Sequence, residues 1–261
     1  MAGGLKKMSY TSVEMMTVAA ARVLEDKKTV FVGTGLPLLS AMLAKRLHAP
    51  NLTLIFESGS IGSLVPRVPL SVGDSLSFYR ALLLSGMDYV MSVAQGGFVD
   101  YGFIGGAQID SYGNLNTTVI GSWYKPMVRL PGSGGNNDVA SFCWKTIIIM
   151  KQDKSKFVKK LDFMTSPGYI DSKGREPKGL PKDTGPFRLI TQLGVYDFNP
   201  ITKKIRLIET YPGVNLQDIQ NNSSFEIEVS ETVKVSDAPS GNELKIMREL
   251  DPLGVVISFK K

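Results

Sequence analysis

Residues 52–62 have the sequence LTLIFESGSIG, and the rest of the chain can be arranged around this stretch. Leu54, Ile55 and Phe56 form an unbroken apolar run, which is typical of a strand buried on both faces in a parallel sheet. The run ends at Glu57, and small residues follow at once. Open α/β sheets bind ligands in the crevice beyond the carboxyl ends of their strands. Glu57 therefore has two interpretations: a cap or surface ion pair, or a carboxylate nucleophile of the kind used in covalent catalysis.

Helices and strands are expected to alternate before this stretch. Thr11 and Glu14 have the spacing of a capping box, which predicts a helix that runs to about Asp26. A strand over 29–32 and a helix over 37–47 follow. Such alternation predicts a parallel sheet with right-handed crossovers. The expected fold class is therefore α/β, with an open, mostly parallel sheet flanked by helices.

The remaining elements are predicted from hydrophobic runs and turn residues. We expect a helix that begins at Asp74 or Ser75 and extends through 81–84, strands over 89–93, 101–104, 117–120 and 145–150, a C-terminal hairpin of strands 187–198 and 201–208, and short helices over 216–220 and 242–250. Residues 151–186 are polar and rich in Lys, Pro and Gly. We interpret them as a surface excursion of one domain that spans residues 1–261.

The charge balance is moderately basic, with 30 Lys and Arg against 24 Asp and Glu. The basic residues are concentrated over 145–204, without the interleaved aromatic residues that a stacking platform for nucleic acid needs. No nucleic-acid partner is expected. The basic segment is interpreted as a solvated face or as a source of attraction toward anionic phosphates, including those of a nucleotide-like cofactor.

Cys143 and His48 are the only cysteine and the only histidine. A single cysteine forms no intrachain disulfide, and a single histidine cannot supply a multi-histidine metal site. The N-terminus lacks the apolar core of a signal peptide, and no run approaches the ~20 apolar residues of a membrane span. We expect a cytoplasmic protein with no metal site and no membrane association.

Two glycine-rich stretches are further candidates for a site. In QGGFVDYGFIGGAQIDSYGNLNTT, residues 95–118, Gly105-Gly106-Ala107 indicates a close approach of the backbone to another group. In PGSGGNND, residues 131–138, consecutive small residues could expose backbone N–H groups as an anion-holding nest. The alternative for the second stretch is a plain solvent loop with a helix cap at Asp138.

Five motifs together resemble a known family. They are FESGSIG (56–62), GFIGGAQIDSYGNLNTTVIG (102–121), VRLPGSGGNND (128–138), YPGV (211–214) and ELDP (249–252). They are similar to the β (B) subunit of family I coenzyme A transferases, above all the glutaconate type, in the same order over nearly the whole chain. The resemblance implies an α/β fold shared with ribose-phosphate isomerases. It also implies a separately encoded α subunit and an α2β2 assembly with active sites between unlike subunits.

The same resemblance implies an activity and a set of site residues. Glu57 would attack an acyl-CoA, and CoA would pass between carboxylic acids by a ping-pong route through a glutamyl-CoA thioester. CoA is then a substrate, and no permanently bound cofactor is expected. Gly134, Gly135 and Asn136 are the implied oxyanion hole. The implied contacts to CoA and substrate are Ser58, Gly59, Gly105, Gly106, Ala107 and Gln108.

Two departures from the family pattern and two alternative functions remain open at this point. Asn136 stands where the family has alanine, and Tyr211 precedes Pro-Gly-Val where histidine is usual; both could alter substrate choice. One alternative keeps the fold but hydrolyses a ring carbon–carbon bond in a steroid-derived CoA thioester, or decarboxylates its substrate. The other is a non-catalytic ligand-binding module in which Glu57 is structural.

Overall fold

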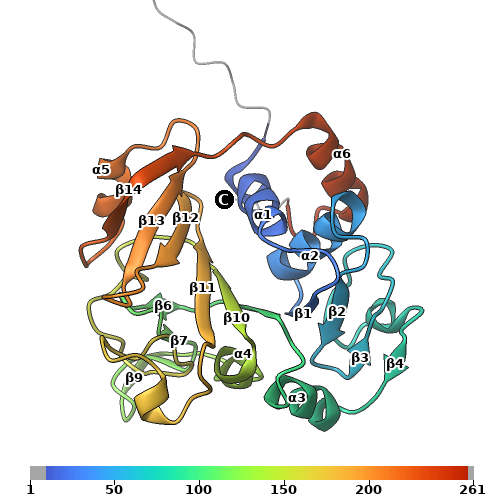
Figure 1. The fold of residues 1–261 in the computed structure, drawn as a ribbon, viewed down its shortest axis with the longest axis horizontal. Helices are drawn as coiled ribbons and strands as arrows, with labels where there is room; N and C mark the ends of the chain where they lie inside the picture. The colour runs from blue at the N-terminus through green and yellow to red at the C-terminus, as the bar shows by residue number, and fades with distance from the viewer. Residues whose placement is uncertain (1–9, 258–261) are drawn as a thin grey trace, which may run out of the picture.

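Ten strands form one mixed sheet in the computed structural model, which describes residues 10–257 (Figure 1). Their bounds are β1 (Thr29–Val32), β2 (Thr53–Phe56), β3 (Ser60–Ile61), β4 (Leu83–Leu84), β5 (Tyr101–Ile104), β10 (Lys145–Ile149), β11 (Gly185–Ile190), β12 (Gly194–Phe198), β13 (Ile205–Thr210) and β14 (Glu228–Val235). The order across the sheet is β14-β13-β12-β11-β10-β5-β1-β2-β3-β4. The central strands β11, β10, β5, β1 and β2 are parallel, and antiparallel pairs flank them on both sides. The predicted α/β class with a mostly parallel sheet is confirmed.

The order in which strands are added to the sheet reverses between the neighbouring strands β1 and β5. From β1 it crosses through a helix to the neighbouring β2, whereas from β5 it continues to β10 on the other side. The two strands are adjacent, with Val30 paired to Tyr101 and Phe31 to Gly102. Their carboxyl ends therefore form the edge of the sheet at which open α/β folds hold ligands.

Helices cover both faces of this sheet, as Figure 1 shows. On one face lie α1 (Ser12–Arg22), α2 (Leu36–Leu47) and α6 (Gly241–Leu250), and on the other lie α3 (Met87–Gln95) and α4 (Asn136–Phe142). Strand β1 contributes to the cores on both faces of the sheet. Val30 and Val32 belong to the core on the face covered by α1, α2 and α6, and Phe31 belongs to the core on the face covered by α3 and α4. Successive residues of a strand point to opposite faces. A run buried on both faces is therefore apolar throughout.

On the first face, α1 near the start of the described residues is joined to α6 near their end. The Thr11–Glu14 capping box forms as predicted, with Glu14 N donating to Thr11 Oγ1 at 3.2 Å and Thr11 N donating to Glu14 Oε2 at 2.7 Å. Glu14 also pairs with Arg248 at 2.8 Å, and Arg22 pairs with Glu243 at 2.8 Å. These two ion pairs join α1 to α6.

Two small hairpins and three short helical segments complete the described chain. Strand β6 (Gln108–Ile109) pairs with β7 (Leu115–Asn116), and β8 (Val119–Gly121) pairs with β9 (Pro126–Arg129). The remaining helices are α5 (Leu216–Asn221) and the short 3-10 segments Ser75–Phe78 and Glu176–Lys178. The polar segment 151–186 lies against the first hairpin through bridges from Phe157 to Ile109 and from Ser166 to Leu115.

Three predicted elements are wrong. Residues 89–93 belong to helix α3, because the buried Val90 and Ala94 have helical spacing that the run Tyr-Val-Met concealed. The helix expected through 84 is only one 3-10 turn over Ser75–Phe78, and β4 follows it. The single strand expected over 187–198 is two strands, β11 and β12, joined by a turn.

Candidate functional site

Glu57 stands directly after β2 at the carboxyl edge of the sheet. Leu54, Ile55 and Phe56 are at most 1% exposed and hold the strand in the core, whereas Glu57 is half-buried. The chain turns immediately, with Gly59 N donating to Phe56 O at 3.0 Å. Gly59 has φ +109°, and a Cβ there would lie 2.0 Å from Ser85 O. Only glycine fits this position, so the turn that presents Glu57 depends on it.

The glycine loop at 134–135 lies against the Glu57 carboxyl group. A Cβ on Gly135 would stand 3.2 Å from Glu57 Oε1 and 3.3 Å from Cδ, and one on Gly134 would stand 3.9 Å from Oε1. The two stretches are far apart in the sequence. The structure thus places the predicted nucleophile beside two residues of the predicted oxyanion loop.

Hydrogen bonds fix the position of this loop. Asn136 Nδ2 donates to Gly105 O at 3.1 Å, and Asn137 Nδ2 donates to Thr165 O at 2.8 Å. Thr117 donates through Oγ1 to Gly132 O at 2.8 Å. The side chain of Asn136 is therefore used to join the loop to the end of β5.

The Glu57 carboxylate has no protein partner in residues 10–257. No described side chain or backbone N–H donates a hydrogen bond to it, and no described lysine or arginine forms an ion pair with it. A half-buried carboxylate without a partner at a strand end is available for reaction. The capping or ion-pair interpretation of Glu57 finds no support within the described chain.

The residues predicted to contact CoA and substrate lie around the same edge, but some of their polar groups already form hydrogen bonds within the protein. Ser58 Oγ donates to Val72 O at 2.7 Å, and Ala107 N donates to Asn116 O at 2.8 Å. Gln108 is buried: its Nε2 donates to Asp162 at 2.9 Å, and its Oε1 accepts from Asn116 at 2.8 Å. Both ends of the Gln108 side chain are thus used inside the protein. A contact from it to substrate would have to replace one of these bonds.

An apolar cavity of about 430 Å³ opens where the carboxyl ends of β1, β5 and β10 meet. Its wall is formed by Val13, Gly35, Leu36, Pro37, Ile104, Gly105, Ile149 and Val256. Gly105 joins this cavity to the glycine loop at 134–135, because its carbonyl accepts the hydrogen bond from the following residue Asn136. The Gly35-Leu36-Pro37 turn was not among the site residues predicted from the sequence. The signal was its position, a Gly-x-Gly turn directly after a buried strand.

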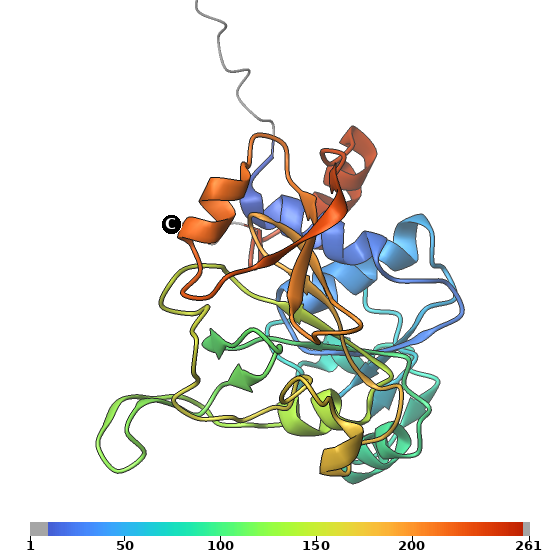
Figure 2. The same ribbon diagram turned by 60° about the vertical axis from the view of Figure 1, so that its left-hand side comes forward.

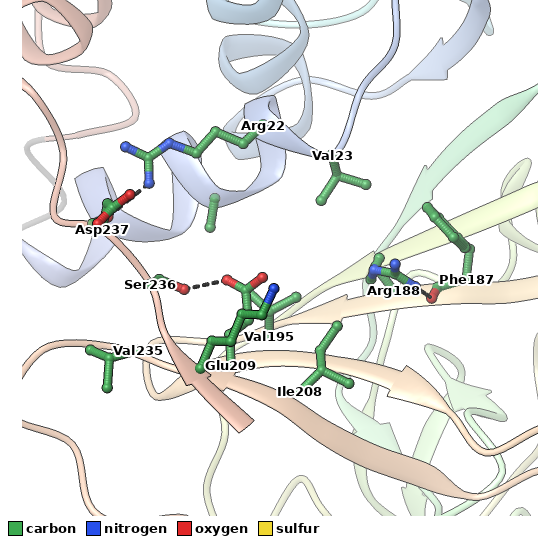
Figure 3. A pocket seen from close by; sticks show the side chains of 12 residues that line it. Arg22, Val23, Phe187, Arg188, Val195, Ile208, Glu209, Val235, Ser236 and Asp237 are labelled. Carbon is green, nitrogen blue, oxygen red and sulfur yellow. Dashed lines mark hydrogen bonds between the residues drawn. The ribbon is translucent and has the colours of Figure 1, made fainter. Parts of the chain in front are cut away.

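A larger hollow of about 580 Å³ lies elsewhere, between α1 and the strands β11 to β14 (Figure 3). Its wall includes Arg22, Arg188 and Glu209, and Ser236 donates a hydrogen bond to Glu209. None of the predicted site residues lines it. Because Glu57 and the glycine loop are absent from this wall, we locate the candidate site by its chemistry and not by its volume.

The lone thiol is buried, and the described residues form no cluster of metal-ligand side chains. In residues 10–257, no group of three or more His, Cys, Asp or Glu side chains is arranged to hold a metal ion. Cys143 is fully buried, and burial raises the pKa of its thiol to about 12. A thiol in this state is a poor nucleophile at neutral pH. No helix in the described part of the chain is both long and apolar enough to cross a membrane.

The fold and the site define an α/β protein with an unpartnered glutamate at a strand end beside a glycine loop. The chain belongs to the coenzyme A transferase family, whose model, described as coenzyme A transferase, matches residues 13–222. It is 40% identical over 256 residues to the β (B) subunit of glutaconate CoA-transferase from Acidaminococcus fermentans, with 94% of each chain covered. The crystal structure of that glutaconate coenzyme A-transferase superposes with a TM-score of 0.91 at 38% identity, covering 97% of this chain and 99% of the other.

Two further relatives show how the family is divided into chains. The β (B) subunit of 3-oxoadipate CoA-transferase from Pseudomonas knackmussii is 40% identical over 245 residues, covering 93% of this chain and 94% of the relative. Caffeate CoA-transferase from Acetobacterium woodii is 25% identical, and the match covers 91% of this chain but only 48% of the relative. The same unit therefore occurs as a separate subunit and as about half of a longer chain.

Proposed function

We propose that this chain is the β subunit of an acyl-CoA:carboxylate CoA-transferase and that Glu57 is its nucleophile. The observation that carries the proposal is the bare Glu57 carboxylate at the end of β2, in contact with the Gly134–Gly135 loop. Membership of the coenzyme A transferase family supports the reaction class. Both relatives at 40% identity are named as single subunits of CoA-transferases, which supports a separate α subunit as partner. An α2β2 stoichiometry and a cytoplasmic location stay predictions.

The first half of the proposed reaction forms a glutamyl-CoA thioester. A Glu57 oxygen attacks the thioester carbonyl of the donor, the C–S bond of the tetrahedral intermediate breaks, and CoA leaves as a thiolate. What remains on the protein is the mixed anhydride of Glu57 and the donor acyl group. The free thiolate then attacks the glutamyl carbonyl of this anhydride and releases the donor acid as its carboxylate. In the second half, the acceptor carboxylate attacks the thioester and the same steps run in reverse. No net proton is transferred, because carboxylate and thiolate alternate as nucleophile and leaving group.

Each tetrahedral intermediate places negative charge on an oxygen that must be stabilised. The backbone N–H groups of Gly134 and Gly135 make no hydrogen bond with any described residue, and both residues lie beside the Glu57 carboxyl group. One preorganised donor of this kind contributes about 3–4 kcal/mol to the barrier reduction in well-studied acyl-transfer enzymes. We assign the oxyanion contact to these two N–H groups and a positioning role to Asn136.

Substrates with a second carboxylate are the first to test. The two relatives at 40% identity are named for glutaconate and 3-oxoadipate, which are both dicarboxylates. We expect a short dicarboxylic acid to be the donor or the acceptor. The ring-cleaving hydrolase and decarboxylase alternatives are not favoured, since the relatives at 40% identity are named transferases. A non-catalytic module is not favoured either.

The test is Glu57→Gln in the assembled enzyme, with CoA exchange between two carboxylic acids as the measurement. We expect exchange to be abolished, while Glu231→Gln, at an exposed position on β14, leaves the rate unchanged. Borohydride or hydroxylamine treatment of acyl-CoA-charged wild type should modify Glu57, as peptide mass spectrometry would reveal. Exchange at the wild-type rate in Glu57→Gln would end the proposal. Turnover without any acceptor acid would indicate hydrolysis in place of transfer.

A further inference from the structure

The hairpin of β8 and β9, residues 119–129, extends away from the rest of the molecule, and we call it the arm. It is the green loop at the lower left of Figure 2. Its two strands pair only with each other and are not part of the ten-stranded sheet. An isolated two-stranded hairpin is marginally stable in water. The arm therefore needs support from contacts outside its own backbone.

The arm exposes large apolar side chains on both of its faces. All four residues of β9 are exposed, where a strand that packs on one side would alternate. Tyr124 is 94% exposed and Met127 is 80% exposed, while Trp123 and Val128 are about half exposed. Trp, Tyr, Met and Arg are the residues enriched in the buried centres of protein interfaces. The composition of the arm is that of an interface and not of a solvent loop.

The turn of the arm, residues 121–126, is held in a defined position by residues 162–163. The Trp123 ring stacks on Phe163 with centroids 5.3 Å apart, and Arg129 lies 4.7 Å above the Trp123 ring. Gly121 N donates to Asp162 at 2.9 Å. A pre-organised apolar surface loses less conformational entropy when a partner binds.

The arm is also positively charged. Lys125 and Arg129 lie on it, and Lys159 and Lys160 are exposed just before Phe163. None of these four cations forms an ion pair with a described residue. The nearby carboxylate of Asp162 is already bonded to Gln108 and to the arm backbone. A partner with acidic groups around an apolar groove would be complementary to this surface.

In the sequence, the arm leads directly into the glycine loop at 134–135. Leu130 N donates to Thr118 O at 3.0 Å, and Gly132 N donates to Thr117 O at 2.9 Å, so the arm closes at its base. Gly134 and Gly135, beside Glu57, follow within a few residues. A protein seated on the arm would therefore lie next to the site.

We propose that the arm is the docking surface for the separately encoded α subunit, through Trp123, Tyr124 and Met127 with Lys125 at the rim. This inference rests on the proposed function, because the α subunit is part of that function. The length of caffeate CoA-transferase supports a partner unit of similar size, since this chain matches only 48% of it. A second copy of this chain fits less well, because the chain carries a net charge of +6 and a basic arm would meet a basic surface.

The test uses the α subunit of the same enzyme, co-expressed with this chain and also purified for titration. We expect Tyr124→Ser and Met127→Ser each to weaken the αβ complex at least tenfold, and Lys125→Glu to weaken it most at low salt. Ile201→Ser is the matched control, because Ile201 is 85% exposed in the turn between β12 and β13, away from the arm. It should bind like wild type. The exposed positions leave the monomer fold intact, which circular dichroism would verify.

The possible results distinguish a failure of the proposed docking surface from a failure of the proposed function. If wild type forms an active complex that Glu57→Gln inactivates, and the arm variants bind the α subunit as tightly as wild type, the docking surface is wrong and the function stands. If wild type forms no complex and has no exchange activity, both proposals fail. If wild type self-associates in the absence of the α subunit and the arm variants abolish that association, the arm joins two copies of this chain, which also overturns the proposal.

Discussion

Gly135 and Glu57 are packed so closely that a methyl group on the glycine would stand 3.2 Å from Glu57 Oε1. This distance is shorter than an ordinary van der Waals contact between such atoms. The backbone at Gly135 has φ −78° and ψ 0°, a conformation that alanine adopts without strain. The glycine is therefore required by space beside the carboxylate and not by its own backbone conformation.

Gly135→Ala tests this relationship. We expect kcat for CoA exchange to fall by about 100-fold or more, the scale of losing one oxyanion donor, because the methyl group pushes the loop away from Glu57. The melting temperature should change little. Gly241→Ala is the control, because a Cβ there meets nothing within 4 Å.

Met91 needs its own control, because its Cε would lie 2.8 Å from a Cβ at position 135. Met91→Ala combined with Gly135→Ala removes that contact and leaves the one with Glu57. The double variant should remain as slow as Gly135→Ala. A return to the wild-type rate would show that the effect came from Met91 and not from the carboxylate.

Asn136 is predicted to act through the position of the loop. Asn136→Ala removes the 3.1 Å hydrogen bond to Gly105 O, a contribution of about 1 kcal/mol, so kcat should fall by roughly five- to tenfold. Asn136→Asp should be slower still, because a carboxylate would face the Gly105 carbonyl without a proton to donate. Rates measured with a saturating α subunit would separate positioning from assembly. Equal rates for Asn136→Asp and wild type would contradict the assignment.

Sequence reasoning predicted the position of Glu57 at a strand end because the relevant pattern is local. The buried run 54–56 followed by Glu57 predicted both the strand and its end, and β2 ends at Phe56. The capping box of Thr11 and the strand over 29–32 were likewise confirmed. These features depend on neighbours within one turn or one strand.

The features that sequence reasoning missed depend on contacts between distant segments. The run around Tyr89 was assigned to a strand, yet it is helical because Val90 and Ala94 pack beneath the sheet beside Val139. The bonds of Gln108 to Asp162, 54 residues away, could not be seen in the sequence. The exposure of the arm is equally a property of the folded chain, since its sequence alone is compatible with a buried hairpin.

Acid sensitivity is expected from the ion pairs that join α1 to α6. Burial raises the pKa of Glu14, but hydrogen bonds from Arg248 and Thr11 outweigh it and lower the pKa from 4.5. Burial also raises the pKa of Glu243, and its bonds to Arg22 and Ser240 likewise give a net lowering. A carboxyl group with a lowered pKa in the folded state stabilises the fold above its unfolded pKa. This stability is lost as the pH falls through the folded pKa.

The melting temperature should therefore drop steeply below about pH 4.5, as calorimetry from pH 7 to pH 3 would measure. In the double variant Glu14→Gln with Glu243→Gln, the melting temperature should be lower at pH 7 and change less across this range. Glu231→Gln, at an exposed position, should keep the wild-type profile. Parallel profiles for the wild type and the double variant would contradict the role of these two pairs.

Arg175 is a buried cation that binds backbone carbonyls instead of a carboxylate. It is 3% exposed, and its two Nη atoms donate to the carbonyls of Pro167, Gly168, Ala140 and Ser141 and to Thr184 Oγ1. Burial lowers its pKa to about 10, so it remains charged at neutral pH. Because Ala140 and Ser141 lie in α4, Arg175 fixes the helix that follows the Gly134–Gly135 loop.

Arg175→Met should lower the free energy of unfolding by roughly 3 kcal/mol or more, because several buried carbonyls lose their donor. Arg175→Lys should recover only part of the loss, since an ammonium group cannot reach both ends of the carbonyl set as a planar guanidinium does. Urea titration measures both values, with Arg46→Met, at an exposed position of α2, as the control.

The activity of Arg175→Lys gives a second comparison. At urea concentrations below its unfolding midpoint, Arg175→Lys should keep more exchange activity than Gly135→Ala, because the lysine variant leaves the loop beside Glu57 intact. An equal loss of activity in the two would mean that α4 sets the geometry of the loop directly.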